Sequence, residues 1–484
     1  MTPENRLPRW QMILYASGSL AVALSYQSFA TYIQFVYIDV LGLAARWVGL
    51  AWSIYGVWNA INDPLSGYWS DRTKTRWGRR IPWIAGSFIP LSITFYFLWT
   101  PPAGLVAGRS TGLLLYFLGF VLLFDFFWTV VVMNWTALFP EMVPDERQRA
   151  VVSAWRQIFS LVGLLIGVAL PPVLAGADWG NRGNMALLLA VVTAIFFGLS
   201  LLGSRERRIF HQDMALPFRQ ALRATLANRD FLFFLGANLM IQFIFMMLAA
   251  TVPFYTKYAL NIQGPLALPN GMTLAAELQT SLFLAVAFIV AMPAMPIWMK
   301  LAQRWGARGI LQICCLTTAA ALVYFFWPTG FYAGILGTTL LGLNLAGLLM
   351  LTDLLVADVV DADELTTGAR REGMYFGMNG FVIRFAFTIQ GFITGTVLTL
   401  SGYVSPANGS LLAAQPASAV MGIRWMLAGI PAIAAILACL LLLGYSLHGQ
   451  KLTDMQTRVA ALHEQKAAQQ RLSFGTAQSS TTGR

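Results

Sequence analysis

Residues 112–137 read GLLLYFLGFVLLFDFFWTVVVMNWTA, and Asp125 carries the one charge in this stretch. At 1.5 Å per residue, a helix of this length rises about 39 Å, enough to cross the roughly 30 Å hydrocarbon core of a bilayer. The backbone N–H and C=O groups of an α-helix pair with one another, which a solvent without water requires. The stretch therefore predicts a transmembrane helix.

The rest of the chain has the same character. Hydrophobic residues make up 57% of the 484 residues and charged residues only 11%, whereas soluble domains carry roughly 25% charged residues. Apolar runs of spanning length recur throughout, which excludes a soluble protein and favours an all-α polytopic membrane protein. The predicted spans are 11–38, 47–69, 81–100, 112–137, 152–174, 185–203, 231–256, 277–299, 308–327, 331–357, 373–400 and 421–446.

Basic residues are distributed unevenly between the predicted connectors. Of the 32 lysines and arginines, 25 fall on the side that holds both termini, and two lie within spans. The other side holds five: Arg46, Arg109, Arg182, Lys257 and Arg424. Positively charged connectors stay in the cytoplasm. We therefore expect twelve helices in the cell membrane with both termini cytoplasmic, and no nucleic-acid partner despite the net charge of +11.

The chain divides into halves around its longest internal connector. We expect a six-helix bundle at 1–203, a cytoplasmic connector at 204–230, a second six-helix bundle at 231–446 and a cytoplasmic tail at 447–484. The strings RWGR at 76–79 and RWGAR at 304–308 occupy equivalent connectors of the two halves. Such an echo is typical of transporters built from two related bundles.

The tail has its own pattern, with helical periodicity over 451–472 followed by a Ser/Thr/Gly-rich end. It predicts an amphipathic helix on the membrane surface or against the bundle. Docking of a partner is the alternative.

Polar side chains inside spans are costly in lipid and so mark candidate functional positions. Asn59 and Asp63 are four residues apart and share one helix face, and Pro64 frees a backbone carbonyl beside them. This group could coordinate a cation or carry a proton. The alternative is a structural role for Asp63 as a helix cap or ion-pair partner.

Further polar candidates lie deeper in the membrane. Asp125 and Thr129 are one turn apart, with Asp125 near the middle of its span. Arg156 and Arg384 are the intramembrane cations, and each could pair with an acid or bind a hydroxyl-rich or anionic solute through its rigid donor fork. Trp128 could stack on a sugar or pack within the bundle.

Charged residues near the cytoplasmic span ends are candidates for a gate that breaks and re-forms, with a solvated surface network as the alternative. The candidate gate residues are Asp71, Arg72, Arg79, Arg80, Glu141, Asp358, Asp361, Arg370 and Arg371.

No enzyme constellation is present in the sequence. It has no zinc-ligand spacing and no phosphate-binding loop, and its three histidines lie in polar segments. Its three cysteines lie inside apolar runs and predict free thiols rather than disulfides. We expect no catalytic residues, no structural metal and no cofactor.

Several strings occur in order from the second span to the eleventh. They are NDPLSG at 62–67, GYWSDR at 67–72, TRWGRR at 75–80, LFPEM at 138–142, ADVVD at 357–361 and RREGMY at 370–375. In these strings the sequence resembles the major facilitator superfamily, and specifically its glycoside–pentoside–hexuronide:cation symporter family, typified by melibiose permease. The resemblance implies the two-bundle fold and coupled sugar transport.

The resemblance also implies roles for individual residues. The family's cation site falls on Asn59, Asp63 and Thr129, and an amide at 59 in place of a carboxylate favours a proton over sodium, with a sodium ion near Asp63 as the alternative. Two carboxylates that bind sugar in the family are replaced by Ala23 and Val132.

The leading hypothesis is a monomeric, cation-coupled symporter of a glycoside or related small polar solute that works by alternating access. Asp63, Asn59 and Thr129 would bind the ion. The substrate cavity would be lined by Asp125, Arg156, Arg384 and Trp128. Two alternatives stay open: a carrier of lysolipids or other amphiphiles with the same fold, and a transporter-like solute sensor that transports nothing.

Overall fold

The computed structural model describes residues 7–464, except 74, 109–110, 144–145, 177, 207–226, 263, 269–271, 368–371, 406–413, 460 and 463. The long helices of the first half are α1 (Arg9–Phe35), α2 (Ala45–Arg72), α3 (Ile81–Trp99), α5 (Thr111–Met142), α6 (Glu146–Ala175) and α7 (Arg182–Gly203). Those of the second half are α9 (Arg229–Phe254), α10 (Ala276–Trp305), α11 (Ala307–Tyr324), α12 (Phe331–Thr367), α13 (Glu372–Leu400) and the α14 (Ala417–Arg424), η4 (Trp425–Gly429) and α15 (Ile430–Leu441) rod.

Shorter elements complete the description. They are η2 (Val36–Val40), α4 (Ala103–Gly108), η3 (Tyr255–Ala259), the two-stranded hairpin β1 (Leu266–Ala267) and β2 (Thr273–Leu274), and η5 (Leu442–Gly444). Among the described residues, ten helical segments are long and apolar enough to cross a membrane. The other two long helices, α1 and α2, bury several polar residues, including Ser28, Gln34, Asn59 and Asn62. They complete the predicted twelve-helix fold.

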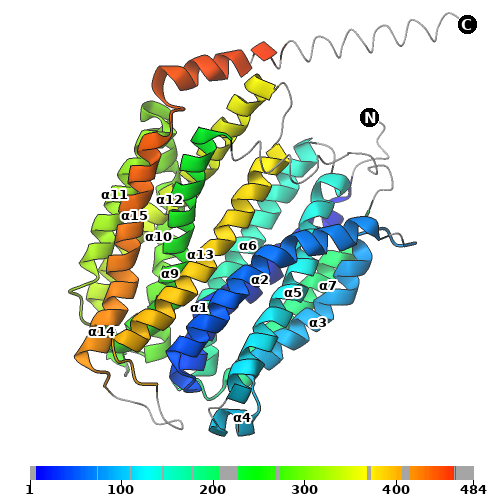
Figure 1. Ribbon diagram of the computed structural model, residues 1–484. Coiled ribbons are helices and arrows are strands. Elements are labelled where there is room, and N and C mark those ends of the chain that lie inside the picture. Colours follow the sequence, from blue (N-terminus) through cyan, green and yellow to red (C-terminus); the bar gives the residue numbers. More distant parts are fainter. Residues whose placement is uncertain are drawn as a thin grey trace, which may run out of the picture.

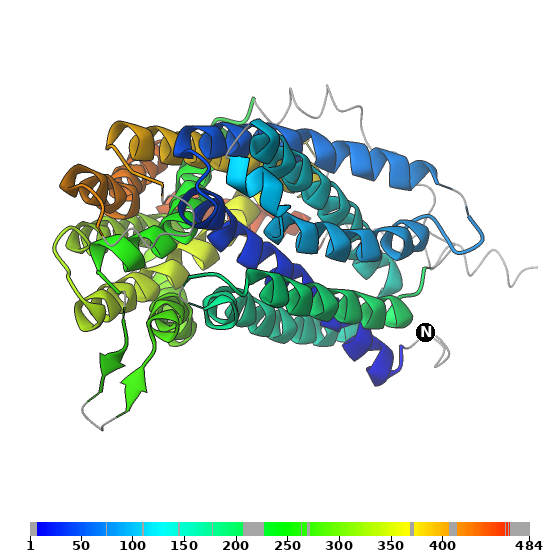
Figure 2. The same ribbon diagram turned by 90° about the horizontal axis from the view of Figure 1, so that it is seen from below.

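The long helices form two bundles that lie side by side, with α1, α2, α3, α5, α6 and α7 in one and α9 to α13 with the α14–η4–α15 rod in the other (Figures 1 and 2). Inter-bundle packing runs mainly through α2 against α13, α6 against α10 and α1 against α9. The start of α1 and the helix at 449–459 lie at one end of the molecule, which we call the terminal face (Figure 1). The ends of α1 and α9, where η2 and η3 follow, lie at the opposite face.

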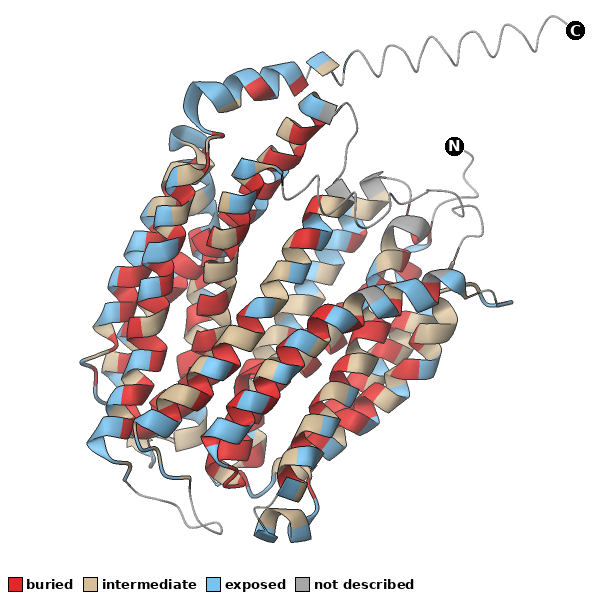
Figure 3. Cartoon of the chain, viewed as in Figure 1, coloured by how far each residue is buried: buried red, intermediate tan, exposed pale blue. Residues whose placement is uncertain are grey.

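Buried residues lie toward the bundle interiors and exposed residues toward the outside (Figure 3). Many of the exposed residues have large apolar side chains. Leu202 and Phe392, for example, are 72% and 66% exposed. A protein surrounded by water rarely exposes so many large apolar side chains. The predicted fold of a polytopic, membrane-embedded protein is therefore confirmed.

The two halves repeat local structure at equivalent places. The first helix of each half ends in a π-helical turn, η2 or η3, followed by a residue in the left-handed region, Gly42 at φ 73° and Asn261 at φ 55°. The echoing connectors also match, because Gly78 and Gly306 both have positive φ, at 107° and 85°. These repeats agree with the duplicated pattern in the sequence.

The tail helix at 449–459 packs against the second bundle (Figure 1). Met455 and Val459 are buried in the same core cluster as Leu355 and Val359 of α12. The prediction of an amphipathic helix lying against the bundle holds for this described part of the tail.

Candidate functional site

An ion pair joins the two bundles where α2 crosses α13. Arg384 on α13 donates from Nε and Nη2 to Oδ2 of Asp63 on α2, at 3.1 and 2.8 Å. The hydroxyl of Thr129, on α5, donates to Oδ1 of Asp63 at 3.3 Å. The side chains of Arg384 and Asp63 are 21% and 24% exposed, so the pair is partly accessible.

Small residues allow α2 and α13 to approach closely enough for this pair to form. A Cβ atom on Gly49 would lie 2.6 Å from the Cα of Gly395, and one on Gly56 would lie 2.6 Å from the backbone nitrogen of Thr388. Real Cβ atoms do not come this close, so the crossing depends on these glycines. Asp63 lies about two turns after Gly56 on α2, and Arg384 lies about one turn before Thr388 on α13. The close crossing of the two helices therefore brings these side chains within reach of each other.

Asp125 is enclosed beside this pair. It is 2% exposed and accepts hydrogen bonds from the amide of Asn59 at 2.5 Å and from the amide of Asn62 at 3.1 Å. Asn59, expected beside Asp63 in the cation site, thus donates to Asp125. Asn62 was not singled out from the sequence, although its spacing of three from Asn59 places both on one helix face.

Aromatic rings surround the polar cluster. Tyr26 of α1 packs against Trp128 of α5 with ring centroids 4.8 Å apart, and against Phe387 of α13 at 6.3 Å. The indole N–H of Trp128 is buried and has no hydrogen-bond partner among the described atoms. Trp128 therefore contributes to packing here and also retains a free donor.

Arg156 lies apart from Asp63 and Asp125. Its guanidinium sits over the rings of Trp135 and Phe139, at 4.4 and 4.8 Å from their centroids. It has no carboxylate partner among the described side chains. Cation–π contacts rather than an ion pair hold this predicted cavity residue.

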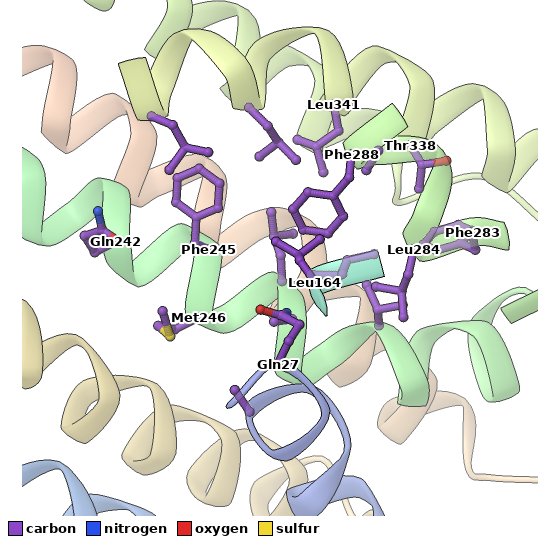
Figure 4. Close-up of a pocket in the computed structure, with 18 of the residues that line it drawn as sticks. Gln27, Leu164, Gln242, Phe245, Met246, Phe283, Leu284, Phe288, Thr338 and Leu341 are labelled. Atoms are coloured by element: carbon purple, nitrogen blue, oxygen red, sulfur yellow. The ribbon is translucent and has the colours of Figure 1, made fainter. Parts of the chain in front are cut away.

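An apolar chamber of about 250 Å³ opens between the bundles (Figure 4). Most of its wall comes from α9, α10 and α12 of the second bundle, and α1 and α6 close its other side. The residues that line it include Tyr26, Gln27, Ala30, Leu164, Gln242, Phe245, Met246, Phe283, Leu284, Phe288, Thr338 and Leu341. Among the predicted cavity residues Asp125, Arg156, Arg384 and Trp128, none lines this chamber.

A second inter-bundle cluster closes the opposite face, and it was missed from the sequence. Asp39 in η2 accepts hydrogen bonds from Lys257 and Tyr258 in η3 and from Tyr403 after α13. Burial, followed by the charge of Asp39, raises the pKa of Tyr403 well above its usual value, so Tyr403 stays a donor. The available signal was that Asp39 and Lys257 end the first helix of each half.

The predicted gate residues are distributed over both bundles at the terminal face. Arg79 and Arg80 lie in the connector between α2 and α3, and their backbone N–H groups donate to Glu206, which follows α7. These hydrogen bonds stay within the first bundle. Arg72 lies over the ring of Tyr68 at 3.9 Å. Asp358 is hydrogen-bonded to Gln456 of the tail helix.

The remaining gate candidates are Asp361, Arg370, Arg371, Asp71 and Glu141. Asp361 makes further polar contacts. Arg370 and Arg371, with the side chains of Asp71 and Glu141, lie outside the described residues.

Fold and site together define a secondary transporter of the major facilitator superfamily (MFS): two six-helix bundles, repeated halves, and a polar site between them. The chain matches the family described as MFS/sugar transport protein over residues 14–449, and it belongs to that family. It is a transporter of the sugar-symporter type and not an enzyme.

Individual relatives agree with this assignment. The chain is 24% identical to the isoprimeverose transporter of Lactiplantibacillus pentosus, covering 96% of this chain and 94% of that protein. It is 23% identical to the sodium-dependent lysophosphatidylcholine symporter 1 of Mus musculus, over 64% of this chain and 62% of that one. The inward-facing crystal structure of a bacterial homologue of the human lysosomal transporter Spinster has a TM-score of 0.66 at 14% identity, covering 91% of this chain and 98% of that one.

Proposed function

We propose that the protein couples the entry of a glycoside or related small solute to a cation, most simply a proton, by alternating access. The observation that carries this proposal is the ion pair between Asp63 and Arg384, because it links the two bundles through a group that a cation can neutralise. A proton on Asp63 removes the charge that holds Arg384. The contact between the bundles then weakens at the level of the membrane where the solute must pass.

The terminal face is assigned to the cytoplasm, since 25 of the 32 basic residues lie on that side of the predicted topology. The cluster at Asp39 then closes the external side of a cell membrane. The hydrogen bonds and ion pairs described between the bundles extend from the Asp39 cluster at the opposite face to the Asp63–Arg384 pair, which lies nearer the terminal face. This arrangement fits an inward-facing state, in which loss of the ion and solute to the cytoplasm precedes resetting.

The surroundings of Asp63 favour a proton over a sodium ion. Hard metal cations take several oxygen ligands. Beside the Asp63 carboxylate, the hydroxyl of Thr129 is the oxygen-bearing group that contacts it among the described side chains, which is a small ligand set for a metal ion. Asn59 is engaged with Asp125, although its own Oδ1 is buried with no partner among the described atoms. That oxygen is the one a sodium ion near Asp63 would recruit, so sodium is the alternative to be tested.

Uptake into proteoliposomes tests the coupling directly. The probes are labelled methyl xyloside, methyl glucoside and glucuronic acid, with either a pH difference or a sodium gradient imposed. We expect the pH difference to drive accumulation, up to about tenfold per pH unit for one proton per solute. Asp63→Asn should abolish it, whereas the control Asp178→Asn, in the exposed turn before α7, should not.

Two results would oppose the proposal. Accumulation driven by sodium alone would assign the site to that ion. Full proton-driven accumulation by Asp63→Asn would remove Asp63 from the coupling mechanism.

A second candidate, an amphiphile carrier, is favoured by one observation, the apolar chamber. A lysolipid would be expected to use such a space for its chain. Uptake of labelled lysophosphatidylcholine below its micelle concentration separates the two, because an amphiphile carrier should accumulate the lipid itself and a glycoside symporter should not.

A further inference from the structure

The apolar chamber offers very few polar groups. Of its lining side chains, only Tyr26, Gln27, Gln242 and Thr338 carry one. Thr338 already donates to the carbonyl of Ile335 at 3.0 Å, and the amide of Gln27 donates to Thr31 at 3.1 Å. The hydroxyl of Tyr26 and the amide of Gln242 are left as the polar groups for an occupant.

A free sugar fits this chamber poorly. Each hydroxyl that leaves water without a new hydrogen bond costs free energy, and a monosaccharide carries several hydroxyls. An alkyl chain or aromatic ring, by contrast, would gain contact with the rings of Phe245 and Phe288, which face the space from α9 and α10 (Figure 4). The lining therefore selects an apolar occupant.

The chamber adjoins the polar site through one residue. Tyr26 lines the chamber and packs against Trp128 at 4.8 Å and Phe387 at 6.3 Å, next to the Asp63–Arg384 pair. A molecule with its polar part at the bundle interface would pass Tyr26 to place an apolar part in the chamber. Both bundles contribute to the wall, so an occupant would contact both.

We propose that the apolar chamber binds the aglycone of the transported molecule, so that the substrate is an alkyl or aryl glycoside rather than a free sugar. This inference rests on the proposed function, which supplies the glycoside. Gln242 binds the linking oxygen or a hydroxyl at the mouth of the chamber, and Phe245, Phe288 and Leu341 contact the apolar group.

A chain-length series tests the chamber. Binding of methyl to hexyl β-glycosides of xylose, glucose and glucuronic acid is measured with the full chain in lipid nanodiscs, below micelle concentrations. Each added methylene should strengthen binding about fourfold until the chamber is full. Leu341→Trp should flatten this rise, because Leu341 is 5% exposed and forms the chamber wall.

The matched control is Leu340→Trp, the same substitution one position away on α12, where Leu340 is 38% exposed on the outer surface. It should keep the rise with chain length, which excludes simple partition into lipid. If Leu341→Trp does not fold, Leu341→Gln gives the same readout by placing an amide on the wall.

Each outcome decides the matter. If affinity rises equally with alkyl length in Leu341→Trp, Leu341→Gln and the unmodified protein, the alkyl group of the glycoside enters lipid instead of the chamber, and the proposal is overturned. A flat series, or a series in which no glycoside binds, would also overturn it. Loss of proton coupling with the rise intact would instead refute the proposed function and leave the chamber assignment standing.

Discussion

At the scale of single residues, the account depends on charges that meet far from one another in the sequence. Asp63 and Arg384 were each predicted as functional from their cost in lipid, with an ion pair as the alternative for each, but their pairing with each other was not predicted. Sequence spacing relates residues on one helix, and these two are on different bundles. For the same reason Asn59 was expected beside Asp63, four residues away, whereas its amide turns to Asp125 on another helix.

The ion pair makes a prediction about stability. Arg384→Gln leaves Asp63 without its cation partner, and should lower the free energy of unfolding by about 1–3 kcal/mol, since the pair is partly exposed. The double variant Asp63→Asn/Arg384→Gln carries no unpaired charge and should recover part of this loss. Denaturation midpoints in nanodiscs measure both. A double variant less stable than Arg384→Gln would contradict the pairing.

At the scale of elements, the apolar runs predicted the long helices, because a bilayer leaves the backbone few other choices. The π-helical turns η2 and η3 and the hairpin β1–β2 were not predicted, since they follow from local backbone geometry at span ends rather than from periodicity. The crossing of α2 and α13 was also not predicted, because glycines such as Gly49 and Gly56 gain meaning only from the partner helix.

The crossing predicts different outcomes for two glycines of the same helix. A Cβ atom on Gly49 would meet the backbone of Gly395 at 2.6 Å, whereas one on Gly67 would meet, among the described atoms, Met133 at 3.9 Å. Gly49→Ala should therefore separate the bundles at the opposite face, and Gly67→Ala should not. Spin labels at Arg46 and Val404, on either side of this face, report the change as a longer distance distribution.

Equal distance distributions for Gly49→Ala and the unmodified protein would show that the crossing tolerates a methyl group. A shift in Gly67→Ala of the same size would point to a general loss of helix packing.

At the scale of the whole molecule, the structure has one end closed by buried contacts. Asp39 takes hydrogen bonds from three side chains of the other bundle, and its own side chain has no exposure. Opening this end must break all three contacts together. Asp39 and Lys257 lie in the equivalent turns η2 and η3 of the two halves, but this equivalence was not recognised from the sequence, and only the assembled bundles show the two residues as a closing contact.

The closing contact makes its own prediction. Asp39→Asn removes the charge that Lys257 pairs with, and should increase the outward-open fraction, seen as a longer distance between the labels at Arg46 and Val404. The control is Asp178→Asn, which alters an exposed carboxylate bonded within its own turn to Gly180. An unchanged distance distribution in Asp39→Asn would show that the cluster does not hold this end shut.

The central claim is that Asp63 couples solute movement to a proton, and comparison of exchange with accumulation in Asp63→Asn proteoliposomes tests it most directly. Exchange of labelled for unlabelled methyl glycoside needs the bundles to rock with solute bound, whereas accumulation also needs the proton site to empty and refill. We predict that Asp63→Asn, which mimics a permanently neutral carboxyl, keeps exchange and loses accumulation driven by a pH difference. Accumulation at the level of the unmodified protein would contradict the claim.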